Sequence, residues 1–160
     1  MADIDIFAKQ EIDEKLIIML NVALSSEWIA YIQYSLGASI INGIKTDEIK
    51  AQMLEHADDE KEHATILINR IVELGGKPIT DINNLVNNKY APYAEPDKNG
   101  YSIDILTQNL DSEKQAVKLY TKIIEYVKEK DPITYDLILE ILQDEKEHVE
   151  DFIDILDELN

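Results

Sequence analysis

The sequence contains no cysteine, and its 160 residues include only five glycines and four prolines. The lack of cysteine excludes disulfides, iron–sulfur clusters and thiol nucleophiles, and it gives no reason to expect secretion. No unbroken apolar run approaches the ~18 residues of a membrane span, and the N-terminus lacks the basic and apolar regions of a signal peptide. We therefore expect a cytoplasmic protein without a membrane partner.

Basic residues are also scarce. Lysine and arginine number 15 against 33 aspartates and glutamates, which gives a net charge of −18. Such a surface repels nucleic acid and anionic lipid and attracts cations. Acidic surfaces also simply keep proteins soluble, so the charge becomes informative only if carboxylates occupy apolar positions. The length and the 45% apolar content suit one domain with a full core.

Glycine and proline cluster between long segments of helical periodicity, and no strand-like alternation is convincing. Gly75-Gly76 ends one segment, Ser102 is expected to cap the next, and Asp131-Pro132 is a strong start signal for the last. The pattern predicts four long helices, over about 12–41, 46–74, 102–129 and 132 to the end.

Short links join the first two and the last two of these helices, so each pair is predicted to form an antiparallel hairpin. A loop of roughly 25 residues joins the hairpins. Helices of about thirty residues span ~45 Å, and this loop is long enough to run the length of the bundle. The fold class is therefore all-α, a four-helix bundle of two hairpins with one long crossover.

The two predicted hairpins repeat one motif. The pentapeptide Asp-Glu-Lys-Glu-His occurs twice, ending at His63 and at His148, and each copy follows an isolated glutamate by nearly the same distance, 33 and 32 residues between the glutamates. Each hairpin thus carries a glutamate, a tyrosine seven residues later and a Glu-x-x-His motif: Glu27, Tyr34, Glu60 and His63 in the first, and Glu113, Tyr120, Glu145 and His148 in the second.

Helical spacing places these carboxylates in the core. Glu27 and Glu113 share faces with leucines, and Glu145 lies between Ile141 and Phe152. Four unpaired buried carboxylates would cost more than the ~5–15 kcal/mol net stability of a domain. Two divalent cations would balance four carboxylates, and two neutral imidazoles would complete the ligand set. The pattern therefore predicts a carboxylate site for two metal ions.

Simpler interpretations exist for each part. A lone Glu-x-x-His on an acidic helix is usually a solvated face, and a lone tyrosine on an apolar seam is an ordinary core residue. The conjunction of both motifs in both hairpins favours the metal site. His56 is either an accessory iron site with Glu55 and Asp59 or a surface histidine. The remaining acidic residues of the motifs are expected to be solvated: Asp58, Asp59, Glu62 and Glu147.

At these residues the chain resembles the bacterioferritin and Dps-like group of ferritin-like proteins, over about residues 12–159. The resemblance implies a single ferritin-like di-iron domain over residues 1–160, and tyrosines that hydrogen-bond the ligands at Tyr34 and Tyr120. It also implies terminal ligands at Glu27 and Glu113, bridging ligands at Glu60 and Glu145, and one histidine per iron at His63 and His148.

The sequence departs from the patterns of several related proteins, and these differences narrow the expected cofactor, subfamily and number of subunits. Lys61 stands where bacterioferritins have a haem-ligating methionine, so no haem is expected. Ala116 replaces an additional glutamate of rubrerythrins, and Gln115 stands near the place of the cysteine pair of thioferritins. Since the sequence ends twelve residues after His148, the short fifth helix of 24-subunit ferritins is expected to be absent and a shell of twelve subunits is expected.

Mixed oxygen and nitrogen donors suit two iron ions per subunit, with manganese as the alternative. We expect a ferroxidase that oxidises Fe(II) with O₂ or H₂O₂, for iron storage or peroxide removal. Two other hypotheses stay open. One is a di-iron or di-manganese peroxidase or oxidase without storage, and the other is a helical interaction module with a structural metal or none.

Overall fold

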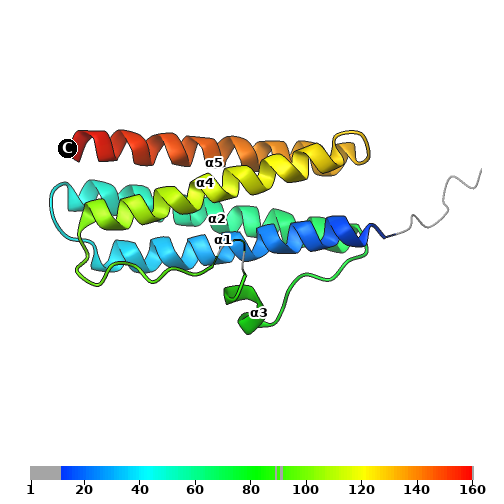
Figure 1. Ribbon diagram of the computed structural model, residues 1–160, viewed down its shortest axis with the longest axis horizontal. Coiled ribbons are helices and arrows are strands. Elements are labelled where there is room, and N and C mark those ends of the chain that lie inside the picture. The colour runs from blue at the N-terminus through cyan, green and yellow to red at the C-terminus, as the bar shows by residue number, and fades with distance from the viewer. Residues whose placement is uncertain (1–11, 89, 91, 160) are drawn as a thin grey trace, which may run out of the picture.

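The computed structural model describes residues 12–88, 90 and 92–159. Four long helices form a bundle, and a fifth, short helix lies outside it in the crossover (Figure 1). The described residues form these helices: α1 (Glu14–Ile40), α2 (Thr46–Glu73), α3 (Ile82–Val86), α4 (Ser102–Val127) and α5 (Pro132–Leu159). The all-α class and the four long helices are thus confirmed, whereas α3 was not predicted.

The hairpins α1–α2 and α4–α5 pack side by side, α1 against α4 and α2 against α5. The crossover between them follows the outside of α1 along its length. Asn21 donates to the carbonyl of Lys77 at 3.0 Å, the Ala94 amide donates to Gln33 at 2.8 Å, and the Asn42 amide donates to the carbonyl of Gly100 at 2.7 Å. The crossover therefore covers α1 and delivers the chain to the start of α4.

The start of α4 differs from the prediction. Ser102 is the first helical residue and Tyr101 occupies the cap position, with no side-chain cap among the described residues. The Ser102 amide donates to the carbonyl of Asn42 at 3.2 Å instead, because the crossover pairs with the α1–α2 turn there. Gly100 has φ of 69°, and a Cβ on it would lie 2.3 Å from the Ile40 carbonyl oxygen, so this close approach requires glycine. At α5 the prediction is confirmed, since Asp131 accepts from the Thr134 amide at 3.0 Å.

Two apolar clusters fill the bundle. One contains Leu20, Leu67 and Ile123, and the other contains Met53 and Phe152. Polar and charged side chains are buried between them. The bundle thus has an apolar cluster toward each end and a polar layer between the two clusters.

Helix α1 is long and apolar enough to span a membrane by length and composition, although the sequence analysis predicted no membrane span. Half of its most apolar window is nevertheless buried inside the bundle. It also carries Glu27 near its middle, 1% exposed. These features are those of a core helix in a bundle.

Candidate metal centre

The polar layer brings together the six predicted ligands, and every one of them is at most 3% exposed. One residue comes from each of α1 and α4, and a Glu-x-x-His pair comes from each of α2 and α5. Their donor atoms form two groups, each with all atoms within 4.8 Å of one another: Glu27, Glu60, His63 and Glu145, and Glu60, Glu113, Glu145 and His148. Glu60 and Glu145 belong to both groups, as expected of bridging ligands.

Both histidines turn Nδ1 toward the carboxylates. Nδ1 of His63 lies 3.3 Å from Glu27 Oε2, 3.3 Å from Glu145 Oε1 and 3.5 Å from Glu60 Oε2. Nδ1 of His148 lies 3.3 Å from Glu60 Oε1. The two imidazoles therefore face the same cluster of oxygens from the α2–α5 side.

Their other nitrogens meet aspartates across the hairpins. Nε2 of His63, on α2, lies 3.1 Å from Asp144 of α5, and Nε2 of His148, on α5, lies 3.3 Å from Asp59 of α2. A carboxylate at Nε2 keeps the proton there and leaves Nδ1 free to bind. The side chains of Asp59 and Asp144 remain 47% and 53% exposed, so Asp59 is solvated as expected, but the contacts of both aspartates with the histidines were not predicted. The signal was available, because an aspartate precedes the glutamate in both motifs.

The tyrosines connect the two hairpins at the same level. Tyr34 of α1 donates its hydroxyl proton to Glu113 of α4, and Tyr120 of α4 donates to Glu27 of α1 at 2.5 Å. Burial and the neighbouring glutamates raise the pKa of both tyrosines well above its usual value. Both hydroxyls therefore remain donors and fix one oxygen of each terminal glutamate.

The polar layer carries more negative than positive charge. Burial, and next the charge of another glutamate, raise the pKa of Glu60 and Glu145 well above the usual range. Burial opposes protonation of both histidines, yet carboxylate neighbours outweigh it, raising the pKa of His148 to about 9 and that of His63 further. Without cations, protons must therefore supply the positive charge that four carboxylates need.

Several donor atoms also lack a hydrogen-bond partner within the described residues: Oε1 of Glu60, both carboxylate oxygens of Glu145 and Nδ1 of His148. A buried acceptor left unsatisfied costs ~1–3 kcal/mol or more. The residues that carry these atoms all belong to the two donor groups. The residues present therefore fit a pair of divalent cations.

The layer is reached from two sides. A cavity of about 440 Å³ extends between α1 and α4 to all four glutamates, lined also by Gln33, Ser112 and Gln115 and by Tyr90 and Pro92 of the crossover. On the α2–α5 side, two smaller cavities of about 170 Å³ each lie beside the histidines and are rich in carboxylates. The carboxylate face and the histidine face thus have separate approaches.

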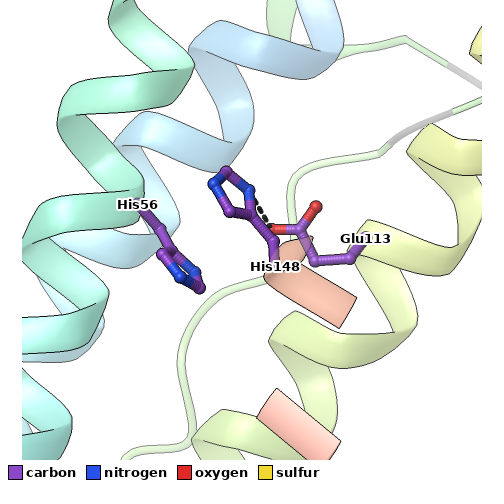
Figure 2. A group of neighbouring side chains, drawn as sticks. All are labelled: His56, Glu113 and His148. Atoms are coloured by element: carbon purple, nitrogen blue, oxygen red, sulfur yellow. Dashed lines mark ion pairs between the residues drawn. The ribbon is translucent and has the colours of Figure 1, made fainter. Parts of the chain in front are cut away.

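His56 is not a surface histidine, because it is only 1% exposed. Its ring stacks on that of His148 with centroids 4.0 Å apart (Figure 2). Glu55 and Asp59 line one cavity with it, while Nε2 of His56 lies 3.0 Å from Asp151 and 2.9 Å from the amide nitrogen of Gln52. Burial, and next the charge of His148, lower the pKa of His56, which favours the neutral ring.

Known proteins share this architecture. The chain is 33% identical to the DNA protection during starvation protein of Pyrococcus furiosus, over 89% of this chain and 77% of that protein. It is similar to a dodecameric thioferritin, the bacterioferritin-related protein of Bacteroides fragilis, with a TM-score of 0.89 and 35% identity over 94% of this chain and 89% of that one.

Two further solved structures are similar at lower identity. A ferritin-like diiron-carboxylate protein of Bacillus anthracis has a TM-score of 0.77 and 25% identity, over 89% of this chain and 96% of that one. The bacterioferritin of Rhodobacter capsulatus has a TM-score of 0.76 and 26% identity, over 92% and 87%. The sequence model of the ferritin-like domain family matches residues 17–160 of the chain. Together with these relatives, the match shows that the chain belongs to the ferritin-like family.

Proposed function

We propose that this protein is a ferroxidase, which binds two Fe²⁺ ions in the polar layer and oxidises them with O₂ or H₂O₂. The observation that carries the proposal is the pair of overlapping donor groups, which share two fully buried glutamates. Oε1 of Glu60 and both carboxylate oxygens of Glu145 lack a hydrogen-bond partner among the described residues. The diiron-carboxylate relative of B. anthracis supports the choice of iron.

The donor set has the chemistry that these ions need. Oxygen and imidazole donors suit Fe²⁺ and Mn²⁺, and four carboxylates neutralise two divalent charges. In the proposal Glu27 and Glu113 bind one ion each, Glu60 and Glu145 bridge, and His63 and His148 complete the two positions. Two adjacent ferrous ions supply the two electrons that reduce one H₂O₂, with two protons, to two waters.

In the proposal, different surroundings of the polar layer admit the cations, admit the oxidant and orient the ligands. Acidic cavities on the α2–α5 side attract cations toward the histidines. The larger cavity between α1 and α4 admits the oxidant to the glutamates. Tyr34 and Tyr120 hold Glu113 and Glu27 in place, so the terminal ligands keep their orientation as the charge of the ions changes.

We further propose that twelve subunits assemble into a shell that stores iron or removes peroxide in the cytoplasm. Ile18 and Leu36 on the outer side of α1 are 64% and 48% exposed, which suits a contact with another copy of the chain. The similar protein of B. fragilis is dodecameric.

The test is rapid mixing of the anaerobic protein, loaded with two Fe²⁺ per chain, with O₂ or H₂O₂. Ferric absorbance should form much faster than in buffer with the same iron, and Glu60→Ala should reduce it to the buffer rate. A normal rate in Glu60→Ala would contradict the site assignment. Sedimentation distinguishes a hollow assembly from a dimer, and a dimer would favour an oxidase without storage.

A further inference from the structure

Beside the metal centre, the two copies of the repeat differ at two positions that are close together in space. Four residues before the repeated glutamate, α2 has His56 where α5 has Ile141. Three residues after the repeated histidine, α5 has Asp151 where α2 has Ile66. The two exceptions are neighbours in space, since Nε2 of His56 lies 3.0 Å from Asp151.

The same exceptions separate the two small cavities on the α2–α5 side. Both cavities have about 170 Å³ and both are lined by Asp59 and Asp144. The cavity beside His63 is completed by the apolar Ile66 and Ile141, whereas its counterpart beside His148 is completed by Asp151 and His56. The two ends of the metal centre therefore differ by one added imidazole with its own carboxylate.

All three histidines of the chain then follow one pattern. In each, Nε2 meets an aspartate of the opposite helix: Asp144 for His63, Asp59 for His148 and Asp151 for His56, at 3.1, 3.3 and 3.0 Å. An aspartate at Nε2 is the usual support of a histidine that binds metal through its other nitrogen. Nδ1 of His56 is buried and lacks a hydrogen-bond partner within the part of the chain that the structure describes.

His56 also lies close to the donors of one cation position. One donor atom each of His56, Glu113 and His148 lie within 4.8 Å of one another, and Glu113 and His148 also belong to the second donor group of the centre. Figure 2 shows the His56 ring beside that of His148, which faces Glu113. No corresponding nitrogen exists at the Glu27–His63 end, where Ile141 occupies the equivalent position.

We propose that His56 is a seventh ligand of the metal centre and binds, through Nδ1, the cation held by Glu113 and His148. The proposal rests on the proposed two-cation site and makes its two positions unequal. One ion has one imidazole and the other has two. Imidazole donors favour the later divalent metals, so the Glu113–His148 position should bind Co²⁺ more tightly than its counterpart does.

The experiment uses the full-length protein loaded with Co²⁺. Each histidine bound to Co²⁺ through Nδ1 gives one strongly shifted, exchangeable Nε2–H proton resonance, and the aspartates slow its exchange with water. The proposal predicts three such resonances from the wild type, and two would overturn it. This measurement does not depend on the folding of a variant.

Stepwise Co²⁺ titration tests the inequality of the two positions. His56→Ile installs the residue of the other hairpin, and it should lose one of the three resonances and weaken the tighter step at least tenfold. Asp151→Ile should weaken the same step less. Asp58→Asn, an exposed change on the same helix that lines neither small cavity, is the matched control and should alter neither step.

The outcomes separate this inference from the function on which it rests. A wild type that binds two Co²⁺ per chain in unequal steps, made nearly equal by His56→Ile, supports the proposal. Two ions bound with the same constants in wild type and His56→Ile would overturn the seventh ligand and leave the two-cation site standing. A wild type that does not bind two ions would overturn both.

Discussion

The hairpins α1–α2 and α4–α5 present the same residue types to the centre of the bundle but differ in what surrounds them. Between Leu16 and Ile40, α1 has Glu27 as its only charged residue, whereas the outer face of α4 carries several charged residues. Helix α1 is covered by the crossover, and its remaining apolar side chains suit a subunit contact. The inner residues thus match between the two hairpins, whereas the outer residues differ with what covers each helix.

The largest effect is expected at the shared glutamates. Glu60→Ala and Glu145→Ala each remove a donor from both cation positions, so each should abolish binding of the ion pair and its oxidation. Because these residues are counterparts in the repeat, the two losses should match. Calorimetric titration with Fe²⁺ without oxygen measures both, and a variant that retained two tight sites would contradict the bridging role.

A smaller effect is expected at the tyrosines. Tyr34→Phe and Tyr120→Phe each remove one hydrogen bond from a terminal glutamate and leave every donor in place. Loss of such support typically lowers metal affinity ~10–100-fold. The same titration should show this loss in both variants with the stoichiometry unchanged, and unaltered affinity in either one would show that its hydroxyl does not orient the ligand.

The third prediction concerns the free energy of unfolding. At the end of α2 and the start of α5, the two hairpins again carry different residues at equivalent positions. Arg70 follows His63 by seven residues, and Ile155 stands at the same place in α5. Arg70 is buried and donates to both oxygens of Asp131, at 3.0 and 2.8 Å. Asp131→Ala leaves this guanidinium without its main partner and removes the cap of α5, so it should cost about 2–4 kcal/mol of unfolding free energy.

The same pair predicts a pH dependence. Burial would raise the pKa of Asp131, but hydrogen bonds from Thr134 and Arg70 outweigh burial and lower it. A carboxyl whose folded pKa is lowered stabilises the protein above its unfolded pKa, and this contribution is lost as the pH falls through the folded value. Denaturant unfolding should therefore show a difference between wild type and Asp131→Ala that shrinks in acid, whereas a constant difference would contradict the ion pair.

The smallest effect is expected at the opposite end of the same helices. Lys45 forms an ion pair with Glu158, and both side chains are solvent-exposed. Exposed pairs contribute little, because water and salt screen the charges. Glu158→Gln should therefore unfold at the same denaturant concentration as the wild type, and it serves as the control for Asp131→Ala.

The sequence predicted most of the bundle because the relevant signals are local. Helical periodicity and Asp131-Pro132 located the long helices, and the repeat located all six side chains that meet in the layer. Helix α3 was missed because its five residues are too few to show periodicity. Tyr101 rather than Ser102 occupies the cap of α4, where the crossover pairs with Asn42, a contact between segments distant in sequence.

The surroundings of the centre were harder to predict than its ligands. Asp144 and Asp151 meet their histidines across two helices, and sequence spacing alone does not show which residues of different helices touch. The burial of His56 likewise depends on how closely α5 packs against α2 at Phe152, whose ring centroid lies 4.8 Å from that of His56. The repeat could have indicated Asp59 and Asp144, which are counterparts, whereas Asp151 and His56 have no counterpart and their contact is known only from the structure.

The most direct test of the central claim is the number of Fe²⁺ ions that the wild-type protein binds without oxygen. The account predicts saturation at two ions per chain, because four buried carboxylates and two imidazoles form two overlapping donor groups. Saturation at two in the wild type, together with loss of both ions in Glu60→Ala, is the expected result. Binding without saturation, or unchanged binding in Glu60→Ala, would contradict it.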